Sequence, residues 1–266
     1  MIQLIRVKSY LILVIVILSS SCDLTPRLYK DILRAQELIS ERKYVEAINQ
    51  YEVTVVKSTN DNIRIKIYYQ LAELYAIHIG DYKKSSIYYN LIKKHSIDPL
   101  WLIKAEEKLG EINYTFLKNY TEALQNYKNL TSFEPRLNSY DQYEFRLGLT
   151  YQKLDIYLSA AKVFSNIQKS KKHKYHLKSI YQLGLLSFEQ KKWQEAITYW
   201  SEYIQKETRK DATVQTKFLM ANAYETMELL KKAYNIYYSI LGEYPNTIVV
   251  KNRLESIYNR RISRKR

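Results

Sequence analysis

Residues able to do chemistry are few in this chain and lie far apart. Of its four histidines, His78, His95, His173 and His176, only the last two could share one face of a helix. They lie in the segment KSKKHKYH, where the lysines would repel a metal ion and no carboxylate or cysteine is near to complete a ligand set. We therefore expect a solvent-exposed turn there and no metal site.

The sequence also lacks the residue patterns of other kinds of catalytic site. A serine or cysteine nucleophile needs a base beside it, and the sequence contains no G-x-S-x-G turn. The five glycines stand singly, so they cannot form a loop that cradles phosphate. Acidic pairs such as Glu106-Glu107 are common on helix surfaces. The sequence therefore favours a protein that is not an enzyme, with no cofactor and no small-molecule substrate.

The first residues have the layout of an export signal. Arg6 and Lys8 precede the apolar run YLILVIVIL, which is followed by three serines and by the only cysteine, Cys22. Such a run covers only about half of a ~30 Å hydrocarbon core, so we do not expect a transmembrane helix. The lone cysteine also excludes a disulfide framework.

The apolar run, the three serines and Cys22 together resemble the signal of bacterial lipoproteins, in which the peptide is cut before a cysteine that then carries lipid. The resemblance implies a cleaved signal peptide at 1–21 and a lipidated N-terminus with a short spacer at 22–27. It implies a lipid-anchored protein of the bacterial cell envelope, at the outer membrane and facing the periplasm. An exported chain of formal charge +15 meets anionic lipid, cell-wall polymers or acidic proteins more readily than nucleic acid.

Composition points to helices. Hydrophobic residues make up 46% of the 266 residues, enough for a core, whereas 5 Gly and 4 Pro supply little turn chemistry for a sheet-rich fold. One pattern then recurs six times: a small residue is followed four places later by an aromatic one. The small residues are Ala47, Ser85, Ala123, Ala160, Ala196 and Ala233, and the aromatic residues are Tyr51, Tyr89, Tyr127, Phe164, Trp200 and Tyr237. A period near 37 residues predicts stacked helical hairpins.

These motifs, with upstream pairs such as Leu147-Gly148 and Leu183-Gly184, resemble the tetratricopeptide pattern. The resemblance implies an all-α, right-handed α-solenoid of about six hairpins over 28–248. A basic capping helix and tail follow at 249–266. The period exceeds the usual 34 residues, so we expect slightly longer helices or loops between repeats.

In tetratricopeptide proteins the first helix of each repeat lines a groove that takes segments of partner proteins. Projecting the pattern gives a candidate partner-binding groove of Tyr69, Phe145, Leu149, Tyr181, Leu185, Phe188 and Phe218. Basic clusters give candidate docking patches for an acidic partner or a lipid surface, at Lys169, Lys171, Lys172, Lys174, Lys178, Arg260, Arg261 and Arg264.

A lipidated cysteine followed only by such hairpins resembles the BamD family of outer-membrane assembly lipoproteins. The likeness rests on YKDILRAQELISERKYVEAINQY at 29–51 and AYNIYYSILGEYPN at 233–246. It implies a scaffold that holds a β-barrel insertase or binds unfolded barrel precursors. The alternatives are a pilotin-like or structural scaffold of an envelope machine, such as a secretin or a flagellar collar, and a cell-wall-binding accessory protein.

Overall fold

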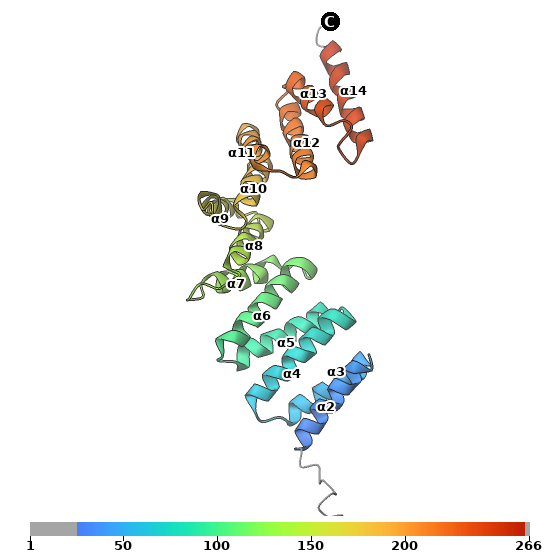
Figure 1. The fold of residues 1–266 in the computed structure, drawn as a ribbon, viewed down its shortest axis with the longest axis vertical. Helices are drawn as coiled ribbons and strands as arrows, with labels where there is room; N and C mark the ends of the chain where they lie inside the picture. The colour runs from blue at the N-terminus through green and yellow to red at the C-terminus, as the bar shows by residue number, and fades with distance from the viewer. Residues whose placement is uncertain (1–25, 264–266) are drawn as a thin grey trace, which may run out of the picture. The chain divides into compact units, whose positions relative to one another are not determined.

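A computed structural model describes residues 26–263 of the chain, which divides after Asp98 into two compact units. Within the described range every regular element is a helix (Figure 1). The first unit holds α2 (Arg27–Ser40), α3 (Tyr44–Lys57), α4 (Asp61–Glu73) and α5 (Tyr82–His95). The second holds α6 (Pro99–Glu111), α7 (Tyr120–Thr131), α8 (Tyr140–Lys153), α9 (Tyr157–Lys169), α10 (His176–Glu189), α11 (Trp193–Lys206), α12 (Lys210–Thr226), α13 (Leu230–Ser239) and α14 (Thr247–Ser263).

The helices pack as consecutive hairpins. α2 pairs with α3 and α4 with α5 in the first unit, and α6 with α7, α8 with α9, α10 with α11 and α12 with α13 in the second. Within each unit the second helix of one hairpin contacts the first helix of the next, and α14 packs on α13. The predicted all-α arrangement of consecutive helical hairpins and a terminal helix is therefore confirmed for the described residues, with two hairpins in the first unit and four in the second.

The repeated motif falls on the second helix of every hairpin and forms its core. The six small residues are fully buried, and their aromatic partners are at most 5% exposed. Gly110, Gly148 and Gly184 of the first helices face these rings; a methyl group added at Gly148 would lie 2.6 Å from the ring of Phe164. Small residues on one helix thus let it approach the aromatic ring of the other.

The turn inside each hairpin repeats as closely as the core does. The residue two places before each second helix has a positive φ: Arg42, Gly80, Lys118, Asp155, Lys191 and Glu228. Such a left-handed residue ends the first helix and reverses the chain. Only the second hairpin uses glycine, which adopts this conformation without strain. The other five hairpins hold a strained side chain at the same place.

We expect Lys191→Gly to stabilise the protein by about 0.5–1 kcal/mol, because glycine removes the left-handed strain of a turn that is already formed. Urea unfolding followed by circular dichroism measures the change. Gly80→Ala is the reverse control and should destabilise by a similar amount. A Lys191→Gly variant less stable than the wild type would contradict this account of the turns.

The second and third hairpins accommodate one extra residue as a π-helical turn. Tyr82 lies ten positions after Ala72 and Tyr120 ten positions after Gly110, whereas Trp193 lies nine positions after Gly184. The first helix of each of these two hairpins ends in a π-helical segment, Leu74–Ile79 after α4 and Ile112–Phe116 after α6. A wider turn absorbs one residue without rotating the helix away from its partner. In these two hairpins one residue of the long period therefore lies in a π-helical turn.

Glu207 organises the connection between α11 and α12. Its carboxylate accepts hydrogen bonds from the Tyr203 hydroxyl at 2.6 Å and from the Arg209 backbone nitrogen at 3.0 Å, and it forms an ion pair with the Arg209 guanidinium at 3.2 Å. Burial alone would raise the pKa of Glu207, but the hydrogen bonds from Arg209 and Tyr203 outweigh it and lower the pKa to about 2. The charged form is therefore the one that the fold stabilises.

Glu207→Gln should lower the free energy of unfolding at pH 7 by about 1–2 kcal/mol. Because the folded pKa is below the ordinary 4.5, the wild-type advantage is present above pH 4.5 and disappears as the pH falls toward 2. Urea unfolding at several pH values measures it. Glu243→Gln, which loses only a surface pair with Lys210, serves as control. A Glu207 effect of equal size at pH 3 and pH 7 would contradict the assignment.

Candidate partner-binding groove

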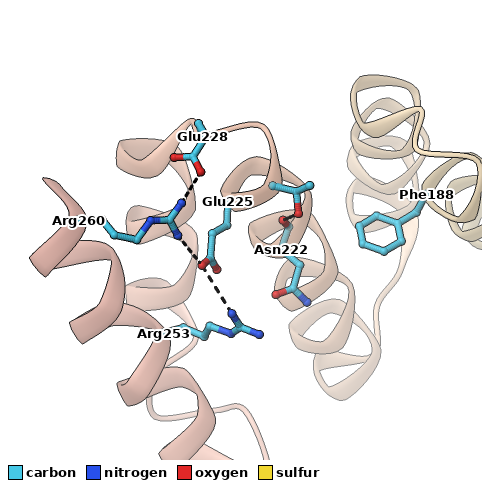
Figure 2. A pocket seen from close by; sticks show the side chains of 7 residues that line it. Phe188, Asn222, Glu225, Glu228, Arg253 and Arg260 are labelled. Carbon is cyan, nitrogen blue, oxygen red and sulfur yellow. Dashed lines mark hydrogen bonds and ion pairs between the residues drawn. The ribbon is translucent and has the colours of Figure 1, made fainter. Parts of the chain in front are cut away.

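A pocket of about 520 Å³ lies between the first helices of the last two hairpins and the terminal helix. Phe188 comes from α10, Asn222, Glu225 and Thr226 from α12, Glu228 from the following turn, and Arg253 and Arg260 from α14. We call this site the α12 pocket. Figure 2 shows the charged side chains meeting around Glu225, with Phe188 on a separate helix.

The charged wall of the α12 pocket is a network centred on Glu225, which is 9% exposed. Its Oε1 lies 3.0 Å from the Arg260 guanidinium and 3.6 Å from that of Arg253, and Arg260 also reaches Glu228 at 2.5 Å. The Tyr237 hydroxyl lies between two acceptors of the pocket, Asn222 Oδ1 and, at 3.2 Å, the other Glu225 oxygen, Oε2. Burial and the nearby Glu225 charge raise the pKa of Tyr237, so this hydroxyl stays a donor.

Helix periodicity explains why two arginines of α14 converge on one carboxylate. Val250, Leu254 and Ile257 form the buried face that fixes α14 against the last hairpin. Arg253 and Arg260 are seven residues apart, or two turns, so they leave the same side of the helix. Arg260 is held by two carboxylates, whereas Arg253 is half exposed and makes only the longer contact. Arg253 is therefore the cation best placed to meet a ligand.

The apolar wall of the pocket is the ring of Phe188. It packs edge-on against Trp193, with ring centroids 4.8 Å apart, and against Trp200 at 5.6 Å. The Asn222 side chain lies between this wall and the arginines. An aromatic anchor beside an amide and an accessible guanidinium can bind a polypeptide segment with one apolar and one acidic side chain.

The other predicted groove residues are dispersed. Tyr69 lies in the first unit, 6.0 Å from the ring of Tyr89. In the second unit, Phe145 is 8% exposed and stacks on Tyr175 at 4.7 Å, and Leu149 packs in the same cluster. Tyr181 and Leu185 pack around the Trp200 cluster, and Phe218 stacks on Tyr244 at 4.3 Å. Of the seven, only Phe188 lines the α12 pocket.

The residues of the predicted basic patches also differ in their surroundings. Arg260 is part of the Glu225 network, and the Arg261 guanidinium lies 5.9 Å from the centre of the Tyr234 ring. The five lysines between 169 and 178 are exposed. Arg264 and the predicted lipid-bearing Cys22 lie outside the described residues.

The expectation of a solvent-exposed turn holds for the connection and its lysines and is wrong for His173 itself. The His173 side chain is 3% exposed, and its Nε2 lies 3.3 Å from Glu144 and 3.5 Å from Asp141. Sequence reasoning found no carboxylate nearby because both acids are about one repeat upstream. Among the described residues, no group of histidine, cysteine or acidic side chains has the arrangement of a metal site. None of the described helices has the length and apolarity needed to span a bilayer.

Comparisons with known proteins support the fold. Residues 178–207 match the family model for the tetratricopeptide repeat. No curated protein sequence matches the chain. Among solved structures, a tetratricopeptide repeat protein from Parabacteroides merdae superimposes with a TM-score of 0.56 at 15% identity, over 90% of this chain and 88% of that one.

Two further structures are similar at the same level. The apo form of RapI gives a TM-score of 0.54 at 15% identity, over 95% of this chain and 80% of that chain. PilW, described as a widely conserved type IV pilus biogenesis factor, gives 0.54 at 12% identity, over 87% and 98%. At these low identities the superpositions show a shared fold of helical hairpins.

Proposed function

We propose that the protein is a non-catalytic scaffold whose stacked tetratricopeptide hairpins bind a partner protein, with the α12 pocket as a contact point. The observation that carries this proposal is the pocket itself. It combines an aromatic anchor at Phe188 with Arg253, a cation that its own carboxylate contacts only at 3.6 Å. Repeat scaffolds present such pockets on rigid helices, which limits the entropy lost when a partner binds.

The site of action that we propose is the bacterial cell envelope, with the protein anchored through a lipid on Cys22. Support comes from the sequence: a basic start, a short apolar run and a lone cysteine directly after small residues. Labelling cells with an alkyne-bearing fatty acid tests it. Wild-type protein should be labelled and Cys22→Ser should not. Unlabelled wild-type protein would contradict the anchor and leave the α12 pocket unaffected.

Within the envelope we propose a role like that of the BamD family, in assembly of outer-membrane β-barrels. The likeness of residues 29–51 and 233–246 supports it. Crosslinking in living cells, followed by purification through a C-terminal tag and mass spectrometry, tests the role. Enrichment of a β-barrel insertase is the expected result. Enrichment of a secretin or a motor component without the insertase would overturn it, as would salt-sensitive binding to purified peptidoglycan alone.

The contribution of the α12 pocket is tested by charge reversal. Arg253→Glu places a second carboxylate beside Glu225 and should reduce partner recovery at least about tenfold, since it removes an attractive charge and adds a repulsive one. Lys251→Glu is the matched control, because it lies on the same helix with the same change of charge and is exposed outside the pocket. Equal partner recovery with the two variants would show that the α12 pocket does not contribute to partner binding.

A further inference from the structure

The connection between α9 and α10 carries a local excess of positive charge. The connection and the adjoining helix ends carry five lysines, which we call the lysine cluster: Lys169, Lys171, Lys172, Lys174 and Lys178. All are exposed, and within residues 26–263 none of them forms an ion pair. Lys174 and Lys178 both lie over the ring of Tyr175, at 5.8 and 5.5 Å from its centre. The cluster therefore holds several like charges in a small area, and within residues 26–263 no carboxylate pairs with their side chains.

The backbone beneath the cluster is fixed to α8. The His173 ring is buried beside Asp141 and Glu144, and its Nδ1 accepts a hydrogen bond from the Tyr175 backbone nitrogen at 3.1 Å. The Lys174 backbone nitrogen donates to Asp141 at 2.8 Å. These contacts, with the stack of Tyr175 on Phe145, hold the loop in one conformation. Little conformational entropy of the loop would therefore be lost on binding.

Neighbouring connections do not share this charge. Because successive helices run antiparallel, the links between hairpins of the second unit lie at the same end of the helices. In the other links basic residues are paired: Arg136 with Asp141 at 2.8 Å, Arg209 with Glu207 at 3.2 Å and Lys210 with Glu243 at 2.8 Å. A broad anionic membrane would also cover these pairs, in which the positive charge is already neutralised. The excess positive charge of the lysine cluster is confined to one connection, so a narrow acidic ligand fits it better than a membrane surface does.

We propose that the lysine cluster is a docking site for an acidic segment of a partner polypeptide, separate from the α12 pocket. Charge complementarity identifies the ligand, and the fixed loop gives the site its shape. Within residues 169–178 no large apolar side chain is exposed to enter a bilayer. The uncapped N-terminus of α10, at Tyr175, adds its partial positive charge to the site.

Binding of a fluorescent oligoglutamate peptide to the full-length protein in detergent tests the proposal. The cluster variant is Lys171→Gln, Lys172→Gln and Lys174→Gln combined. The control removes three exposed lysines elsewhere in the second unit, which makes the same change in net charge: Lys162→Gln, Lys231→Gln and Lys251→Gln. The cluster variant should bind about tenfold more weakly, because three surface charge contacts are lost, and the control should bind like the wild type. Salt should weaken the wild-type complex.

Three outcomes would overturn the proposal. Equal loss in the cluster and control variants would mean that only net charge matters. No binding of the peptide by the wild type would remove the site. Cluster-dependent binding to phosphatidylglycerol vesicles without binding to the peptide would assign the lysines to a membrane instead.

His173→Ala tests whether the fixed loop matters, since it keeps every lysine but removes the buried ring beside Asp141 and Glu144. We expect severalfold weaker peptide binding although all five lysines are retained. The helical circular dichroism signal should be retained. Peptide affinity equal to that of the wild type would show that the lysines bind without the contacts of the His173 ring.

Discussion

Alanine at Gly184 should destabilise the fifth hairpin by about 2–3 kcal/mol, although alanine is the better helix former. Gly184 lies in α10 where it faces Trp200 of α11, and an added methyl group would overlap the indole ring. Trp200 is fully buried, so its ring has no free space into which to move. The steric cost therefore exceeds the gain in helix propensity of about 1 kcal/mol. Urea unfolding measures the difference.

Gly242→Ala is the matched control for this prediction. A methyl group at Gly242 meets nothing within 4 Å, and the residue lies in the connection before α14. We expect a change within about 0.5 kcal/mol there. If Gly184→Ala were as stable as Gly242→Ala, the close approach of the two helices at the repeat motif would be wrong.

Trp200→Ala should have the largest effect of any single substitution considered, a loss of about 3–5 kcal/mol. The ring is 0% exposed, packs against Phe188, and its Nε1 donates a hydrogen bond to the Tyr181 carbonyl at 3.3 Å. Removing it leaves a cavity between α10, α11 and α12. Urea unfolding again provides the measurement, and Tyr238→Ala, an exposed aromatic residue on α13, is the control with an expected effect below about 1 kcal/mol.

Combining the two variants tests the contact itself. Once Trp200 is alanine, the methyl group of Gly184→Ala no longer overlaps a ring and partly fills the cavity. The double variant should therefore be about 1–3 kcal/mol more stable than the sum of the single effects predicts. Strict additivity would show that the two residues do not act on each other.

Local spacing predicted the hairpins because the packing is local. The pair Ala196 and Trp200 is one helical turn apart, and its partner Gly184 lies in the preceding helix. A buried small residue and a buried ring at fixed spacing are required in each copy, so the sequence repeats them. The first residue of α11, Trp193, belongs to the same repeated pattern. This part of the fold follows from one repeat without knowledge of its neighbours.

The α12 pocket and the His173 anchor could not be found in that way, because they join successive repeats. Glu225 and Arg260 are 35 residues apart, and Asp141 and Lys174 are 33 apart. Other side-chain bonds have almost the same separation: Gln152 with Glu189 at 37 and Gln168 with Glu202 at 34. Complementary polar residues about one period apart are thus the signal in the sequence for these contacts. The pattern of small and aromatic residues does not contain this signal.

Site-specific photocrosslinking measures most directly whether the α12 pocket contacts a partner protein. A photoreactive amino acid at Asn222 lies in the pocket, and one at Lys162, exposed on α9, lies outside it. Irradiation of living cells should crosslink the Asn222 variant to one protein, the same one that co-purifies with the wild type, and Arg253→Glu should abolish the product. No product from Asn222, or the same product from Lys162, would contradict this contact.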